Sequence, residues 1–186
     1  MKIILATNNK NKLREFREIL APKGYEVISQ SEAGADIEAD ETGTTFEENA
    51  YIKAKAIYDM LHVPVIADDS GLEVDFLKGA PGVFSARYAE PGHRCERVLN
   101  ELEGVPDAER TARFRCAICY IDAEGKSQYV SGSCEGRIGH ERRGDNGFGY
   151  DPIFLYGDRT LAEMSADEKN AISHRGNAIK ALCGIL

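Results

Sequence analysis

The spacing of apolar residues changes along this chain, and the change restricts its fold to the mixed α/β class. Residues 2–6 and 64–67 form short apolar runs, which are typical of strands buried on both faces. Residues 10–20 carry apolar side chains three and four positions apart, which is the period of a helix. Residues 111–121 and 127–134 instead alternate around a polar turn at 122–125, which predicts an antiparallel hairpin. We therefore expect early βαβ units followed by an antiparallel part.

Capping signals predict two further helices. Thr44 and Glu47 have the spacing of a capping box, ahead of an apolar stripe that ends at Leu61. Ser165 and Glu168 repeat this pattern and start a last helix, which we expect to run toward residue 182. The other expected elements are a strand at 25–28, a loop at 29–43, a half-exposed strand at 72–76 and a helix at 93–103.

Composition and charge exclude several classes of protein. With 186 residues and 42% apolar content, residues 1–186 fit one globular domain, large enough for two lobes around a cleft. A net charge of −8 disfavours binding to a nucleic-acid backbone, so a polyanion would need a local basic site. We find neither a signal-peptide pattern nor an apolar run long enough to span a bilayer. We therefore expect a cytoplasmic protein that binds neither nucleic acid nor membranes.

The cysteines do not point to a special chemistry. Their number, five, is odd and their spacing is irregular, unlike the framework of a small disulfide-rich domain. Cys116 and Cys119 lie in a predicted strand, where an odd spacing sends two side chains to opposite faces. A metal shared by this pair is therefore not expected, and we interpret the cysteines as packing residues.

A basic segment follows the first predicted strand. Backbone N–H groups at a helix start, together with the positive end of the helix dipole, form an anion site. Lys10, Lys12 and Arg14 are unfavourable against that dipole, so their presence favours a bound anion. The alternative is a solvated turn with an Asn cap. A Walker loop is excluded because its glycines are missing.

Two adjacent carboxylates follow the predicted strand at 64–67. Asp68 and Asp69 would lie at the strand end where open α/β sheets place their ligands. Neighbouring carboxylates repel each other unless a cation lies beside them. Mg²⁺ commonly takes one or two carboxylates and completes its shell with phosphate and water oxygens. Glu41 is a candidate second ligand, and the alternative interpretation is an exposed acidic turn.

Two later segments suit a flat polar ligand. Phe148 stands between glycines, which predicts stacking on a base, unless the segment is only a turn before a Pro-bounded strand. Residues 173–176 are expected inside the last helix, where their Gly costs about 1 kcal/mol relative to Ala and requires a break or close packing. His174 and Arg175 would offer donors to a carbonyl or phosphate oxygen, with Lys169 facing the same cleft. The alternative is a surface His-Arg pair.

The order and spacing of these segments resemble the inosine triphosphate pyrophosphatase, or HAM1, family over essentially the whole chain. The matching blocks are residues 6–12, 41–43 with 45–50 and 53, 67–72, 80–82 with 85–88, 147–152 and 173–175. Position 11 departs from the family, since it is Asn where Gly is common. The resemblance implies an elongated mixed β-sheet flanked by helices, an active-site cleft between two lobes, and a homodimer.

The resemblance also implies a reaction and the residues that perform it. The reaction is the Mg²⁺-dependent hydrolysis of ITP, dITP and XTP to the monophosphate and pyrophosphate. Asp69 is implied as the general base, and Glu41 with Asp69 as the metal ligands. The residues implied at the phosphate end are Thr7, Asn8, Asn9, Lys10, Asn11, Lys12 and Lys53. Those implied at the base and sugar end are Phe148, Gly149, Tyr150, Asp151, Lys169, His174 and Arg175, with Ser70 next to Asp69.

Two other functions are compatible with parts of this pattern. A non-catalytic nucleotide-binding module would need the phosphate and base segments, but it would leave the carboxylates at 41, 68 and 69 unexplained. A magnesium phosphohydrolase acting on another nucleotide would use the same groups and release orthophosphate. The products of hydrolysis distinguish these alternatives.

Overall fold

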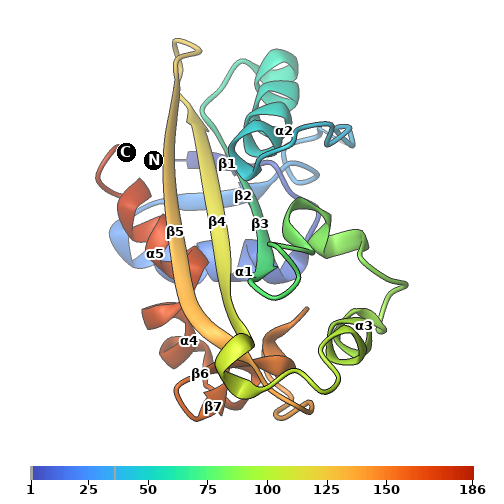
Figure 1. The fold of residues 1–186 in the computed structure, drawn as a ribbon. Helices are drawn as coiled ribbons and strands as arrows, with labels where there is room; N and C mark the ends of the chain where they lie inside the picture. The colour runs from blue at the N-terminus through green and yellow to red at the C-terminus, as the bar shows by residue number, and fades with distance from the viewer. Residues whose placement is uncertain (1, 36) are drawn as a thin grey trace. The chain divides into compact units, whose positions relative to one another are not determined.

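The computed structural model describes residues 2–35 and 37–186, which form a seven-stranded sheet with helices packed against it (Figure 1). The strands lie in the order β2-β1-β3-β4-β5-β6-β7. The chain divides into one compact unit of residues 1–69, 116–132 and 175–186 and another of residues 70–115 and 133–174. The predicted α/β class is confirmed, while the single domain and the cleft stay predictions.

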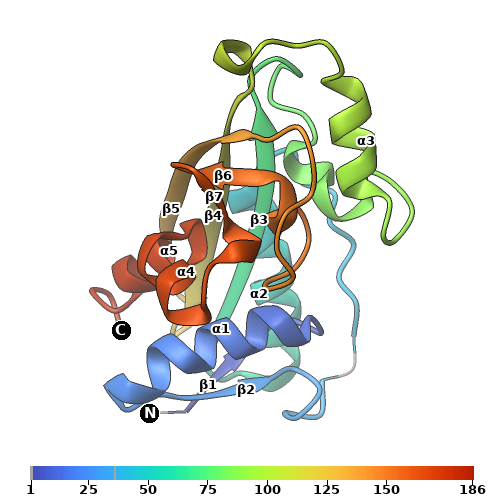
Figure 2. The same cartoon turned by 90° about the horizontal axis from the view of Figure 1, so that it is seen from below.

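The first unit begins with the predicted βαβ units. Strand β1 (Lys2–Leu5) pairs in parallel with β2 (Glu26–Ser29) and with β3 (Val65–Val74). Helix α1 (Lys10–Leu20) and the 3-10 turn η1 (Ala21–Lys23) connect β1 to β2, and helix α2 (Phe46–Leu61) precedes β3. Helices α1 and α2 pack against opposite faces of β1, and α1 lies in the foreground of Figure 2.

Alternate residues of β1 reach two separate cores, which explains why residues 2–6 are so apolar. Ile3 and Leu5 pack with residues of α1 and of α5 (His174–Leu182). Ile4, and Ala6 directly after the strand, pack instead with residues of α2. A strand that is buried on both faces cannot alternate apolar with polar side chains, so its sequence reads as a continuous run.

The same alternation separates Cys116 from Cys119 on β4 (Thr111–Ile121). Cys116 packs in the core beneath α1 and α5, and Cys119 packs in the core beneath α2. The prediction of opposite orientations is therefore confirmed. All five cysteines are free of disulfide bonds.

Strands β4 and β5 (Ser127–Ile138) form the predicted hairpin. Its turn is closed by a hydrogen bond from Asp122 N to Lys126 O of 3.1 Å, and Gly125 adopts a φ of 81° that favours glycine. The second strand ends at Ile138 rather than at residue 134, because its last residues pair with β6 (Phe154–Tyr156).

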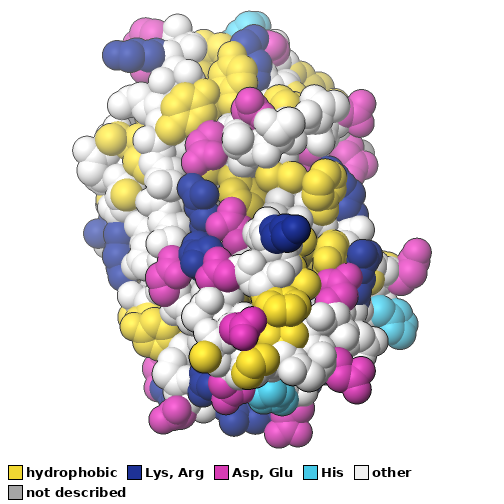
Figure 3. Space-filling view, in the orientation of Figure 1, with side chains coloured by type: hydrophobic (Ala, Val, Ile, Leu, Met, Phe, Trp, Pro, Cys, Tyr) yellow, Lys and Arg dark blue, Asp and Glu magenta, His cyan; other side chains and the backbone are white. Residues whose placement is uncertain are grey.

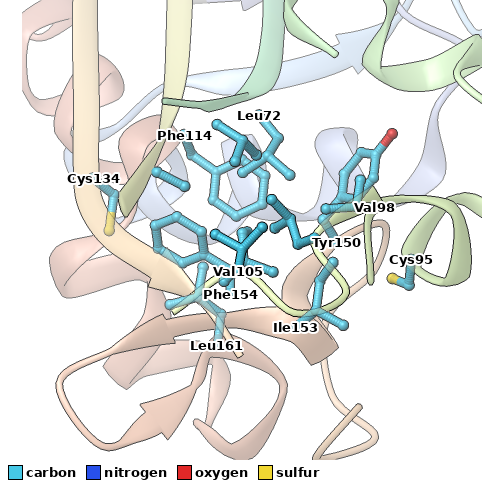
Figure 4. Close-up of a cluster of buried hydrophobic side chains, with 14 of the residues drawn as sticks. Leu72, Cys95, Val98, Val105, Phe114, Cys134, Tyr150, Ile153, Phe154 and Leu161 are labelled. Carbon is cyan, nitrogen blue, oxygen red and sulfur yellow. The ribbon is translucent and has the colours of Figure 1, made fainter. Parts of the chain in front are cut away.

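The second unit surrounds a third core, shown in Figure 4. Phe114 of β4 and Phe154 of β6 lie at its centre, with ring centroids 4.6 Å apart. The other elements are η2 (Gly82–Arg87), α3 (Arg94–Glu101), η3 (Asp107–Glu109), η4 (Asp151–Ile153), β7 (Arg159–Thr160), η5 (Leu161–Glu163) and α4 (Ala166–Ile172). Throughout the described residues, every helix is too short or too polar to cross a membrane.

The prediction that a strand ends before Asp68 is wrong. Strand β3 continues from Val65 to Val74, and Asp68 and Asp69 lie inside it with exposures of 1% and 6%. The alternative of an exposed acidic turn is therefore also wrong. A strand tolerates two buried carboxylates when counter-charges reach both of them, and Lys12, Arg175 and Lys53 supply these charges.

The predicted capping box of α2 lies one residue later than expected. Thr45, not Thr44, is the N-cap, and its Oγ1 accepts from Glu48 N at 3.2 Å. The carboxylate of Glu48 accepts in return from Thr45 N at 3.2 Å and from Thr44 N at 2.6 Å. This register satisfies more backbone donors than a box at Thr44 and Glu47 would.

The single last helix expected from Ser165 is two helices. The chain leaves α4 after Ile172, Ser173 is extended with φ −69° and ψ 156°, and α5 starts at His174. The break thus precedes Gly176, which lies buried inside α5. Of the two alternatives that the sequence left open for this glycine, a break or close packing, the structure shows close packing.

Arg110 ties the elements of the second unit together. Its guanidinium is 2% exposed and donates to the carbonyl oxygens of Leu102, Ile138 and Gly139 at 2.6 to 2.9 Å, and to that of Val105 at 3.3 Å. The chain around α3 is thereby held against the end of β5. A buried carbonyl that loses its donor keeps its full desolvation cost.

We predict that Arg110→Ala lowers the free energy of unfolding by about 3 kcal/mol, because several buried carbonyls lose their donor together. Urea unfolding followed by circular dichroism measures this change. Arg142→Ala is the matched control, since Arg142 pairs with Glu96 on the exposed surface and such pairs contribute about 1 kcal/mol or less. Equal stability of the two variants would contradict the assigned role.

Candidate active site

The N-terminus of α1 is ordered by its own polar side chains. Asn9 is the N-cap, and its Oδ1 accepts from Asn11 N at 2.9 Å and from Lys12 N at 3.2 Å. Asn9 N donates in turn to Thr7 Oγ1 at 3.1 Å. The Asn-capped turn considered from the sequence is therefore present. Asn8, Asn9 and Lys10 are exposed around it.

The carboxylate of Asp68 pairs with basic side chains from two helices of the first unit. Its Oδ2 accepts from Lys12 Nζ at 3.1 Å and from Arg175 Nε and Nη2 at 3.2 and 3.3 Å. Cys116 Sγ lies 3.8 Å from the same oxygen. Burial disfavours the ionised form, but the charges of Lys12 and Arg175 outweigh it and hold the pKa of Asp68 well below its usual range.

Arg175 is itself held between two acidic residues. Its guanidinium is 2% exposed and donates to Glu15 as well as to Asp68. The structure therefore places Arg175 in a buried ion-pair network, not at a surface. A contact between Arg175 and a nucleotide base would require it to exchange one of these bonds.

Asp69 faces a different set of partners. Its Oδ1 lies 3.1 Å from Lys53 Nζ, and its Oδ2 accepts from Asn49 Nδ2 at 3.2 Å. Lys53 also pairs with Glu41 Oε1 at 2.9 Å. Burial and the nearby Glu41 charge raise the pKa of Asp69 despite the opposing effect of Lys53 and Lys12. Asp69 therefore accepts a proton more readily than an ordinary aspartate.

Glu41 and Asp69 form a donor set that fits a hard divalent cation. Both carboxylates are directed at one positive group, the Lys53 ammonium. Within residues 2–35 and 37–186, no point gathers three or more His, Cys, Asp or Glu side chains. Two carboxylates completed by phosphate and water oxygens are a normal arrangement for Mg²⁺.

A second group of predicted residues lies in the second unit. The carboxylate of Asp151 accepts from Lys169 Nζ at 2.7 Å and from Phe148 N at 2.9 Å. Lys169 Nζ also lies 4.7 Å from the centre of the half-buried Phe148 ring. Gly147 leaves the space for this arrangement, because a Cβ there would sit 2.1 Å from Asp151 Oδ2. Phe148, Asp151 and Lys169 therefore form one connected cluster.

Three other predicted residues have different surroundings. Tyr150 is buried in the core of the second unit, and its hydroxyl donates to Ser85 O at 2.7 Å. The His174 ring is 5% exposed and stacks on Phe114, with centroids 4.7 Å apart. Ser70 follows Asp69 on β3 and is half-buried. The two aromatic rings thus take part in the packing of this unit.

Reasoning from the sequence missed Glu15 and Asn49 as members of these networks, and it singled out Asp68 without its buried partners Lys12 and Arg175. Glu15, Asn49 and Asp68 are buried, with exposures of 4%, 0% and 1%. Asn49 interrupts the apolar face of α2, and Glu15 precedes the buried Phe16. A polar residue at a core position needs a buried partner, and that signal was available in the sequence.

The face of the molecule drawn in Figure 3 carries no continuous basic patch. Figure 3 shows acidic and basic side chains interspersed with apolar ones on one face of the molecule. With a net charge of −8, the protein would need local basic groups to bind a polyanion.

Comparison with known proteins identifies the relatives of this chain. The Ham1 family model matches residues 3–185. A dITP/XTP pyrophosphatase of Bacillus subtilis is 50% identical over 189 residues, which cover 98% of this chain and 96% of that protein. The solved structure of the Staphylococcus aureus Ham1 protein is 41% identical with a TM-score of 0.87, and covers 100% of this chain and 97% of that one. A HAM1 protein from Coxiella burnetii is 44% identical with a TM-score of 0.87, over 100% and 98% of the two chains. The chain therefore belongs to the Ham1 family.

Proposed function

We propose that this protein hydrolyses the triphosphates of non-canonical purine nucleosides, namely ITP, dITP and XTP, to the monophosphate and pyrophosphate. Family membership supports a nucleoside triphosphate pyrophosphohydrolase, and relatives that are 50% identical are named dITP/XTP pyrophosphatases. The observation that carries the proposal is the convergence of Glu41 and Asp69 on Lys53, at 2.9 and 3.1 Å. Such a site suits a polyphosphate and its metal ion.

The proposed roles follow the two groups of residues. Glu41 and Asp69 would hold Mg²⁺, and Asp69 would also act as the general base. The residues proposed for the triphosphate are Thr7, Asn8, Asn9, Lys10, Asn11, Lys12 and Lys53. Those proposed for the base and sugar are Phe148, Gly149, Tyr150, Asp151, Lys169, His174 and Arg175, with Ser70 beside Asp69.

The mechanism depends mainly on charge. Attack of water on a triphosphate is opposed by the negative charge of the phosphates, which Lys12 and Lys53 would offset. Magnesium, when bound, would add charge neutralisation and polarise the phosphate oxygens. The Asp69 carboxylate would take the proton of the attacking water, and its raised pKa makes it a stronger base than a solvated aspartate. Asp68 would stay ionised and keep Lys12 in place.

Discrimination against adenine would come from buried donors. His174 and Arg175 are 5% and 2% exposed. A donor facing the 6-position pairs with a keto oxygen, whereas the amino group of adenine would leave it unpaired at a cost of about 1–3 kcal/mol. Arg175 would first have to release Asp68 or Glu15.

The proposed substrates belong to the cytoplasmic nucleotide pool, where we expect the enzyme to act. The homodimer implied by the family resemblance stays a prediction, which analytical ultracentrifugation tests.

The first test is a product assay with ITP, XTP, GTP and ATP in the presence of Mg²⁺, scoring pyrophosphate separately from orthophosphate. We expect pyrophosphate from ITP and XTP and little turnover of GTP or ATP. Orthophosphate as the product would indicate another phosphohydrolase. Tight Mg²⁺-dependent binding without turnover would indicate a binding module.

We predict that Asp69→Asn lowers kcat by about 10²–10⁴-fold, because the amide cannot accept the proton of water. The amide has nearly the same shape as the carboxylate, so the melting temperature should stay close to that of the wild type. Steady-state release of pyrophosphate from ITP measures the effect. Near-normal turnover in a folded variant would remove Asp69 from its proposed role.

We predict that Lys12→Ala weakens binding of the triphosphate by about 10–100-fold, the value of a charge-assisted hydrogen bond, and that of the monophosphate far less. Calorimetric titration with IMP and with an ITP analogue that carries an NH group between the α- and β-phosphorus atoms compares the two affinities. Lys2→Ala is the control, since Lys2 is exposed and lies 4.0 Å from Glu26. Equal losses for both ligands would place Lys12 away from the β- and γ-phosphates.

A further inference from the structure

Asn49 is the one fully buried polar side chain of α2 within the described residues. Its exposure is 0%, and it lies on the face of the helix that packs toward β3. A buried amide costs free energy unless its oxygen and nitrogen both find partners, and an apolar residue would fill this position without that cost. The position therefore calls for an explanation beyond packing.

The amide of Asn49 joins two segments that carry the candidate metal ligands. Its Nδ2 donates to Asp69 Oδ2 at 3.2 Å, and its Oδ1 accepts from the backbone N–H of Gly43 at 2.8 Å. The opposite orientation of the amide would set a donor against the Gly43 N–H and an oxygen against the carboxylate. The two partners thus fix the orientation of the side chain.

Gly43 leaves the space that its hydrogen bond with Asn49 needs. A Cβ at position 43 would lie 2.6 Å from Asn49 Oδ1 and 2.7 Å from Glu48 Cβ. Its φ lies outside the left-handed region, so the close approach, and not the backbone conformation, requires glycine. The loop that carries Glu41 therefore reaches the Asn49 amide two residues after Glu41.

Through its two hydrogen bonds, Asn49 constrains both candidate metal ligands: Asp69 directly and Glu41 through the loop that carries it. Because Asn49 engages Oδ2 of Asp69, the other oxygen, Oδ1, faces Lys53 and the side of Glu41. Because the same amide holds Gly43, the position of Glu41 is tied to that of Asp69. Groups behind a metal ligand commonly change metal affinity about 10–100-fold when they are removed.

We propose that Asn49 is a positioning residue that sets the separation of Glu41 and Asp69 and thereby the affinity of the site for a divalent cation. This inference rests on the proposed function, since it takes these two carboxylates as the metal ligands. Asn49 itself touches neither the substrate nor the metal in this scheme. An aspartate could not replace it, because it would place a second carboxylate against Asp69 and lose the donor.

The test measures metal affinity directly and through activity. Mn²⁺ serves as a paramagnetic substitute for Mg²⁺ and is titrated by electron paramagnetic resonance in the presence of an ITP analogue with an NH group between the α- and β-phosphorus atoms. The Mg²⁺ concentration for half-maximal release of pyrophosphate from ITP is measured in parallel. We expect Asn49→Ala to weaken Mn²⁺ binding and to raise the half-saturating Mg²⁺ concentration by about tenfold or more, with KM for ITP at saturating Mg²⁺ changed by less than about threefold.

A second variant and a control separate this role from general destabilisation. Gly43→Ala acts from the loop and keeps the Asn49 side chain, yet its Cβ displaces the amide, so we expect the same change in metal affinity. It carries the test if Asn49→Ala does not fold. Ile57→Val is the matched control, because Ile57 is a buried core residue of α2 whose apolar side chain forms no hydrogen bond with either carboxylate. It should lower the melting temperature and leave metal affinity unchanged.

The outcomes distinguish this inference from the proposed function. Wild-type metal affinity in the folded variants, with a wild-type enzyme that releases pyrophosphate in a Mg²⁺-dependent manner, would overturn the role of Asn49 alone. A wild-type protein that releases no pyrophosphate from ITP at any Mg²⁺ concentration would overturn the proposed function and the inference together.

Discussion

The neutralisation of two adjacent carboxylates inside β3 is the constraint on which the first unit depends. Asp68 and Asp69 are successive residues of a strand, so their side chains point to opposite faces of the sheet. Removing an ion from water costs several kcal/mol unless a partner compensates it. Lys12 and Arg175 meet Asp68 on the side of α1 and α5, and Lys53 and Asn49 meet Asp69 on the side of α2. The helices on both faces are therefore placed by charge as well as by apolar packing.

The two carboxylates differ in what they can do. Burial opposes ionisation of both, but Asp68 has two cations beside it and its pKa is lowered, whereas Asp69 shares Lys53 with Glu41 and its pKa is raised. One carboxylate is thus a permanent anion that orders basic side chains. The other suits an exchangeable proton or a metal ion, and one strand supplies both environments in neighbouring positions.

The contacts in the second unit instead hold the aromatic ring of Phe148 at a partly exposed position. Asp151 binds the backbone of Phe148 and the ammonium of Lys169 at once, and Gly147 leaves the space for its carboxylate. Tyr150, one residue before Asp151, anchors the same segment in the core. Gly147 thus serves to admit a specific set of contacts around Phe148, a role different from the flexibility that glycine often provides.

The sequence by itself determined the α/β class, most helices and strands, and the opposite orientation of Cys116 and Cys119, because these follow from the period of apolar residues. It also pointed to Asp69 and Glu41 through the chemistry of their carboxylates, and to Lys53 through the family resemblance. It could not show that β3 runs through both carboxylates, since local patterns read adjacent aspartates as a turn. Only the tertiary structure revealed the counter-charges that permit their burial, because Lys12 of α1, Lys53 of α2 and Arg175 of α5 come from segments far apart in the chain. Ion pairing between distant segments leaves no periodic trace in a sequence, and for that reason the buried network around Asp68 and the amide link through Asn49 were decided by the fold.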